Sequence, residues 1–125
     1  MILLGREVEF DESELTLKLT GFVSFCALKS KVVMPYKTIM RVYVDYFDVP
    51  RWMIRLPGTS ISPLNIYEGS FLHNNKWYFL SYERKEPLVI IELDGHKKYS
   101  YVIFAINDPT ETAAEIRRKL ANFAS

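Results

Sequence analysis

The sequence predicts a mainly β domain that ends in a single amphipathic helix, and three observations predict this fold class. Short segments in which apolar and polar residues alternate recur along most of the chain, as in strands with one buried and one solvated face. Aromatic residues make up 14% of the chain, and their side chains favour strands over helices. A strong helix start signal stands at Asp108–Glu111, close to the C-terminus.

The length and composition predict one domain that covers residues 1–125. A chain of this length suits a single domain and buries about two thirds of the surface that its unfolded form exposes. Hydrophobic residues make up 49% and charged residues 25%, which is ordinary for a globular protein, so folding needs no metal or disulfide. Cys26 is the single cysteine, and a reducing compartment is the simplest interpretation.

The strands follow from the alternating segments and from the turn residues between them. Asp11-Glu12-Ser13 is a polar turn, and residues 73–76 include two asparagines that tolerate the left-handed conformation, so each predicts a hairpin. Residues 21–28 fit either a short helix after Thr20 or a connection between two sheets. The segments that we expect to be extended are 7–10, 14–20, 31–34, 39–47, 52–55, 66–72, 77–83, 88–93 and 99–106.

The C-terminal helix has a complete start signal. Asp108 suits the N-cap, Pro109 occupies the first helical position, and Glu111 stands three residues after the cap. The apolar residues of the helix fall on one stripe, which predicts that this face packs on the sheets: Ala113, Ile116, Leu120 and Phe123.

The segment 51–63 is the most unusual stretch and contains the candidate binding site. It combines two arginines, one tryptophan, a Pro-Gly turn and several hydroxyls, which would suit a loop that grips an anionic or peptide ligand. The alternative is a structured connection in which the tryptophan packs and the hydroxyls satisfy the backbone. The candidate ligand-binding residues are Arg51, Trp52, Arg55, Thr59 and Ser60.

The sequence contains no pattern that is typical of a catalytic or metal-binding site. His73 and His96 have no cysteine or carboxylate at metal-ligand spacing, and both are expected to be solvent-exposed turn residues. Asp45 and Asp48 could pair around a strand end, but nothing else supports a catalytic carboxylate pair. We therefore expect a protein that is not an enzyme, with no metal site and no cofactor.

The charge and hydropathy pattern excludes two further classes of partner. The formal net charge is +1, which gives no strong attraction to nucleic acid. The most apolar window, residues 19–28, is bracketed by Lys18 and Lys29 and is far shorter than a membrane span of about 20 residues. These features predict a cytoplasmic protein that has no transmembrane segment and binds no nucleic acid.

Several motifs together are similar to those of a known family. The chain resembles the bacterial pleckstrin-homology-like domains over roughly residues 8–120. This resemblance implies two packed antiparallel sheets that curl into a partly open barrel, with the C-terminal helix capping one end. The stretches that carry it are Met34-Pro35-Tyr36-Lys37-Thr38-Ile39, Arg55-Leu56-Pro57-Gly58-Thr59-Ser60-Ile61, Glu68-Gly69-Ser70-Phe71, Leu88-Val89-Ile90-Ile91-Glu92-Leu93 and Ile106-Asn107-Asp108-Pro109.

The first hairpin argues against the ligand that the family name suggests. Lipid-binding pleckstrin-homology domains concentrate basic residues at the first hairpin and its loop. Here that turn is Asp11-Glu12-Ser13-Glu14, whose carboxylates would repel a phosphoinositide head group. We therefore expect a binding or assembly module for a protein or peptide partner, or one that self-associates through strand edges. The alternative is a small-molecule or lipid head-group binder that uses the 51–63 loop.

Overall fold

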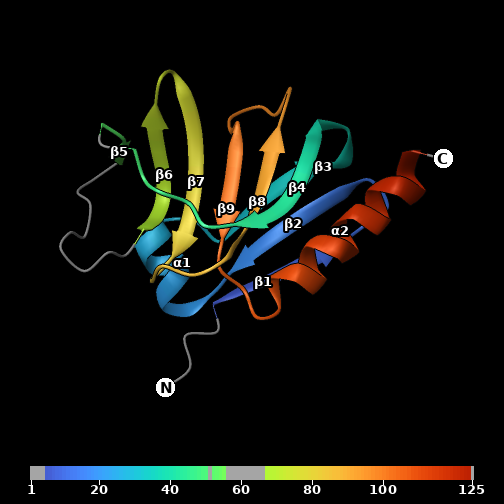
Figure 1. The fold of residues 1–125 in the computed structure, drawn as a ribbon, viewed down its shortest axis with the longest axis horizontal. Coiled ribbons are helices and arrows are strands. Elements are labelled where there is room, and N and C mark those ends of the chain that lie inside the picture. The colour runs from blue at the N-terminus through green and yellow to red at the C-terminus, as the bar shows by residue number, and fades with distance from the viewer. Residues whose placement is uncertain (1–4, 51, 56–66, 125) are drawn as a thin grey trace.

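The computed structural model of the chain describes residues 5–50, 52–55 and 67–124, without the side chains of residues 22 and 55. Figure 1 shows two sheets with a long helix beside them. The elements in chain order are β1 (Arg6–Phe10), β2 (Glu14–Leu19), α1 (Gly21–Ala27), β3 (Lys31–Pro35), the 3-10 turn η1 (Tyr36–Thr38), β4 (Ile39–Asp45), β5 (Ile54–Arg55), β6 (Tyr67–His73), β7 (Lys76–Tyr82), β8 (Leu88–Leu93), β9 (Tyr101–Phe104) and α2 (Pro109–Ala124).

The strands form a three-stranded sheet in the order β1-β2-β3 and a six-stranded sheet in the order β4-β8-β9-β7-β6-β5. The prediction of a mainly β fold with one C-terminal helix is confirmed. The sheets are not closed into a barrel, since among the described residues no strand of one sheet pairs with a strand of the other. Pro35 ends β3, and the buried turn that follows it carries the chain into the second sheet.

One strand pair departs from the expectation of purely antiparallel sheets. β7 and β9 run parallel, with Tyr78 opposite Tyr101 and Ser81 opposite Phe104. β9 returns from β8 as an antiparallel neighbour and inserts between β8 and β7, so the parallel pair arises without a crossover helix. Side chains alternate between the two faces of β9 in the same way whether its neighbour is parallel or antiparallel. The sequence pattern alone therefore does not distinguish parallel from antiparallel pairing.

The structure decides between the two alternatives for residues 21–28 and tests the hairpin predicted at residues 73–76. Residues 21–27 are helical, so the helix alternative was right, and Leu28 ends this helix in the left-handed conformation with φ 58°. Asn74 and Asn75 have φ values of 51° and 63°, the pair of positive values that a two-residue type I′ turn requires. The β6–β7 hairpin is therefore confirmed.

The main core lies between the two sheets and beneath α2. On α2, Ala113 and Ile116 are fully buried and Leu120 is partly buried, so the predicted stripe faces the core. Phe123 is 47% exposed and makes an edge-on contact with Tyr36 at a ring-centroid distance of 5.3 Å. Since there is no closed barrel, α2 does not plug a barrel mouth but packs along β4 and β8.

A second apolar layer covers the opposite face of the large sheet. β4 and β5 lie at opposite edges with four strands between them, a separation of about 24 Å at the usual strand spacing. The described parts of the segment between them, residues 46–50 and 52–53, run across the large sheet (Figure 1). Phe47, Val49 and Met53 of this connection pack against the buried cluster on this face, which includes Leu80 and Ile103. This explains why the central strands are apolar on both faces.

Neither α-helix in the described part of the chain combines the length and apolar character that a membrane span needs.

Candidate functional site

β4 is an edge strand of the large sheet, and the hydrogen bonds of β8 show which of its backbone groups face outward. The N–H of Leu93 donates to the carbonyl of Ser100, on the side of β9, with an N···O distance of 2.8 Å. Alternate residues of a strand direct their backbone groups to opposite neighbours. The residues of β8 whose backbone faces β4 are therefore Leu88, Ile90 and Glu92.

The register of β4 then shows which of its residues face outward. Arg41, Tyr43 and Asp45 lie opposite the β8 residues that face β4, so their backbone groups are used in the ladder. Val42 and Val44 consequently direct their N–H and C=O groups away from the sheet. No other strand of the described residues pairs with this edge. It presents a row of backbone donors and acceptors that no described strand pairs with.

An open groove of about 680 Å³ runs along this edge between β4 and α2. Within it the Nη1 group of Arg117, from α2, donates to the carbonyl oxygen of Val42 at 2.9 Å. A side-chain donor thus takes one of the two acceptor positions of this outward-facing carbonyl oxygen. The groove combines apolar and charged side chains: Met40, Arg41, Val42, Tyr43, Asp45, Arg117 and Leu120.

The outer face of the edge carries an arginine that is held by an ion pair. Arg41 donates from Nε and Nη2 to Oε1 and Oε2 of Glu92, at 3.2 Å and 2.6 Å, and its guanidinium lies 5.0 Å from the ring centroid of Tyr43. The Tyr43 hydroxyl also donates to Glu92 at 2.9 Å. These hydrogen bonds, led by that from Arg41, lower the pKa of Glu92 from its ordinary value. Arg41 is therefore held in place beside Tyr43 although it is largely exposed.

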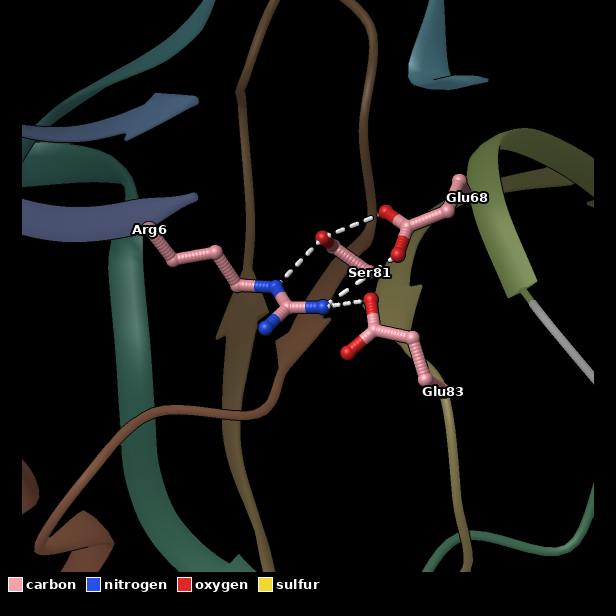
Figure 2. A network of polar contacts seen from close by, with 4 residues as sticks. All are labelled: Arg6, Glu68, Ser81 and Glu83. Atoms are coloured by element: carbon pink, nitrogen blue, oxygen red, sulfur yellow. Dashed lines mark hydrogen bonds and ion pairs between the residues drawn. The ribbon is translucent and has the colours of Figure 1, made fainter. Parts of the chain in front are cut away.

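A second polar cluster is buried between the sheets, at the end far from the β4 groove. Figure 2 shows the guanidinium of Arg6 pointing toward Glu68, Ser81 and Glu83. Its Nε donates to the Ser81 hydroxyl at 2.7 Å, and its Nη2 donates to Glu68 at 3.2 Å and also to Glu83. The Ser81 hydroxyl in turn donates to Glu68 at 2.7 Å. The cluster joins β1 of the small sheet to β6 and β7 of the large sheet.

The pKa of Glu68 is raised from 4.5 to about 9 in this cluster. Burial is the largest cause, because the charged carboxylate loses its hydration, and the hydrogen bond with Glu83 adds to it. The hydrogen bond from Ser81 and the charge of Arg6 act in the opposite direction. Glu68 therefore keeps its proton near neutral pH while it faces the guanidinium of Arg6. Neither of the two cavities whose linings are described includes these residues.

Most of the binding site predicted from sequence lies outside the described residues. This holds for Arg51, Thr59 and Ser60 and for the side chain of Arg55, whose backbone pairs with Phe71 in β5. Trp52 is described and is 78% exposed, so it does not pack into the core as the structural alternative required.

His96 is partly buried and links the two sheets, so the expectation of a solvent-exposed turn residue was wrong for it. Its Nε2 donates to the carbonyl of Val33 at the edge of β3, at 2.8 Å. Its Nδ1 accepts from the backbone N–H groups of Lys98 and Tyr99, both at 3.0 Å. These three bonds assign the neutral tautomer with the proton on Nε2.

The other candidate reactive groups have separate partners. Asp48 pairs with Lys85 at 3.0 Å, Asp45 accepts from the N–H of Tyr46, and His73 contacts Asn74. Among the described residues, no group of three or more metal-binding side chains converges.

The two polar features that matter most were missed at the sequence level. The segment 39–47 was predicted as a strand, but nothing was inferred about its position at an edge. Arg41 and Asp45 offered a signal, since charged residues on a strand are typical of sheet edges. Glu68 gave no comparable signal, because a glutamate in an alternating strand is ordinarily interpreted as solvent-facing.

Comparison of the chain with protein-family models, curated proteins and solved structures found no match.

Proposed function

We propose that this protein is a non-enzymatic binding module that holds an extended protein segment by adding it to β4 as a further strand. The observation that carries this proposal is the outward direction of the backbone groups of Val42 and Val44 at an edge with no partner strand among the described residues. Two outward residues offer two donors and two acceptors to an incoming chain. Strand addition of this kind derives affinity from the main chain and specificity from the flanking side chains.

The groove beside the edge supports the same function. An isolated edge strand is a liability, and proteins usually cover or blunt it. Here Val42 is only 6% exposed, and the Arg117 guanidinium binds its carbonyl oxygen at the point where the N–H of an added strand would compete. Met40 is 59% exposed and lies beside Leu120 in the groove, so the groove provides apolar surface for the side chains of an added strand.

The family and location inferred from sequence belong to the same proposal. Two sheets with a C-terminal helix support a bacterial pleckstrin-homology-like domain, although the sheets do not close into the barrel of that family. The lone, buried Cys26 supports a location in the cytoplasm.

Binding can be tested with a displayed library of random twelve-residue peptides. We expect selected peptides to bind the wild-type protein and to lose affinity for a Val44→Pro variant, because proline removes the outward N–H that the added strand needs. Hydrogen exchange at the Val44 amide should slow when a selected peptide is bound. Peptides that bind both proteins equally and leave this amide unprotected would contradict strand addition.

A matched control exists on the other sheet. The N–H of Thr20 donates to the carbonyl of Gly5, so Gly5 faces β2 and the backbone of Val8 faces outward from the edge strand β1. Val8→Pro therefore makes the same change at a different edge and should leave peptide affinity unchanged.

A further inference from the structure

We propose that the segment added to β4 is β4 of a second copy of this chain, paired antiparallel about a two-fold axis at Tyr43. This inference rests on the strand-addition function proposed above and names its partner. The two six-stranded sheets would then form one continuous sheet across the axis. Such a contact is isologous, so each residue of β4 must be complementary to its own symmetry-related position.

The charges of β4 meet this requirement. An antiparallel pair centred on Tyr43 places Arg41 opposite Asp45 of the second copy, and the two-fold axis repeats this contact. Arg41 and Asp45 lie on the same face of the strand as Tyr43. Opposite charges directly across a strand pair stabilise it, and like charges destabilise it. The strand therefore carries a charge pattern that matches itself in this register.

Arg41 and Asp45 can each form further hydrogen bonds to a second chain. Arg41 uses two of its five N–H donors on Glu92, which fixes the guanidinium and leaves three donors. No cation among the described residues pairs with Asp45, whose Oδ1 accepts the N–H of Tyr46. An Asp45 carboxylate at the edge thus has an oxygen available for a second chain.

The backbone geometry fits the same register. Val42 and Val44 face outward, and in this pairing Val42 lies opposite Val44 of the second copy. The two residues exchange both backbone hydrogen bonds, which the axis doubles to four. Tyr43, whose backbone faces β8, forms the close, non-hydrogen-bonded pair at the axis. A register shifted by one residue would place the outward groups opposite inward ones and lose these bonds.

Arg117 leaves this edge accessible to the second copy. Its Nη1 group, from α2, donates to the Val42 carbonyl oxygen at 2.9 Å and takes one of the two lone pairs of that oxygen. The oxygen has a second lone pair, so the incoming Val44 N–H can bind with Arg117 still in place or after it turns away. The self-matching charges favour a second copy over an unrelated peptide, which would need its own acidic and basic residues at this spacing.

Charge reversal with heterodimer rescue tests the inference. We expect sedimentation equilibrium to show a reversible wild-type dimer, and Arg41→Asp or Asp45→Arg to raise its dissociation constant at least about tenfold, because each places like charges across both contacts. Mixing the two variants restores both opposite-charge contacts, so a heterodimer should form about as tightly as the wild type. Lys18→Asp, on an exposed strand position that also pairs with a glutamate, should have no effect.

The outcomes separate this inference from the proposed function. A wild-type monomer at millimolar concentration, or variants that neither weaken nor rescue dimerisation, would overturn self-pairing. If displayed peptides still bind a monomeric protein and require the Val44 N–H, strand addition stands and the second copy is the wrong partner. A dimer that Val44→Pro leaves intact would overturn the pairing at this edge, and peptide binding to that variant would overturn strand addition as well. Circular dichroism of each variant confirms that it is folded.

Discussion

Arg6 and Glu68 join the two sheets through a buried hydrogen bond. The Nη2 of Arg6, from the small sheet, lies 3.2 Å from Oε2 of Glu68, 62 positions along the chain in the large sheet. The two side chains are only 7% and 2% exposed. Glu83 lies against the same guanidinium, so the pair is one cation facing two carboxyl groups (Figure 2). The charge and protonation of this cluster therefore bear directly on how stably the sheets are held together.

Protein stability should fall as the pH rises from about 5 to about 9, with Glu68 as the cause. The folded chain keeps the Glu68 proton up to a pKa of about 9, whereas the unfolded chain releases it near 4.5. The stabilisation from this raised pKa is complete below the pKa of the unfolded chain and is lost progressively as the pH rises toward the pKa of the folded chain. Between these two values the unfolded chain releases the proton and the folded chain does not, so rising pH favours unfolding. Urea unfolding at a series of pH values measures this slope.

Glu68→Gln should flatten this pH dependence, because an amide keeps the shape of the carboxyl group but does not titrate in this range. Glu7→Gln, on the exposed part of β1 next to Arg6, is the matched control and should keep the wild-type slope. If the slope survives in Glu68→Gln, another group is responsible for it.

Removing the buried cation Arg6 should lower the free energy of unfolding far more than removing a cation at the surface. We expect Arg6→Met to lower the free energy of unfolding by about 3–5 kcal/mol at neutral pH, because it removes the donor that Ser81, Glu68 and Glu83 share and leaves these buried groups without their hydrogen bonds. Adding Glu68→Gln to this variant should recover part of the loss. Lys18→Met breaks an exposed pair of 3.5 Å with Glu9 and should cost about 1 kcal/mol or less. Equal losses for the two single variants would show that the buried pair is not a major support.

His96 should stabilise the fold through the contact between sheets. His96→Ala removes one bond to the edge of β3 and two that hold the turn after β8, so we expect a loss of about 1–3 kcal/mol in urea unfolding. His73→Ala is the comparison, since its Nε2 bonds only the neighbouring Asn74 side chain at an exposed turn, and it should cost less. A His96 variant as stable as the His73 variant would remove this role.

The local elements could be predicted from sequence because their determinants are local. Alternation and turn residues located nearly every strand, and the asparagines of residues 74–75 predicted the hairpin whose positive φ values they adopt. The order of strands could not be predicted in the same way. Strands 77–83 and 99–106 have apolar residues on both faces, which indicates a central position but not which neighbour each will have. The parallel β7–β9 pair was therefore missed.

The candidate site was harder to predict because it depends on the absence of a neighbouring strand beside β4 among the described residues. The sequence of β4 showed its two faces correctly from Arg41 to Asp45, but an edge is defined by neighbours that the sequence does not display. A bulge at Met40, which has no register partner between Ile39 and Arg41, also shifts that residue out of the simple alternation. The segment that drew attention, 51–63, lies mostly outside the described residues.

The packing of α2 can be tested along its apolar stripe, because burial decreases toward the C-terminus. Ile116 is fully buried in the main core, whereas Phe123 is 47% exposed and contacts the ring of Tyr36. Ile116→Ala should lower the free energy of unfolding by about 2–5 kcal/mol, since it removes three buried carbons and leaves a cavity. Phe123→Ala should cost less despite the larger truncation, because half of that ring already lies in water. Urea unfolding of both variants gives the order of the losses. A greater loss for Phe123→Ala would mean that the end of the helix, and not its middle, anchors α2 to the sheets.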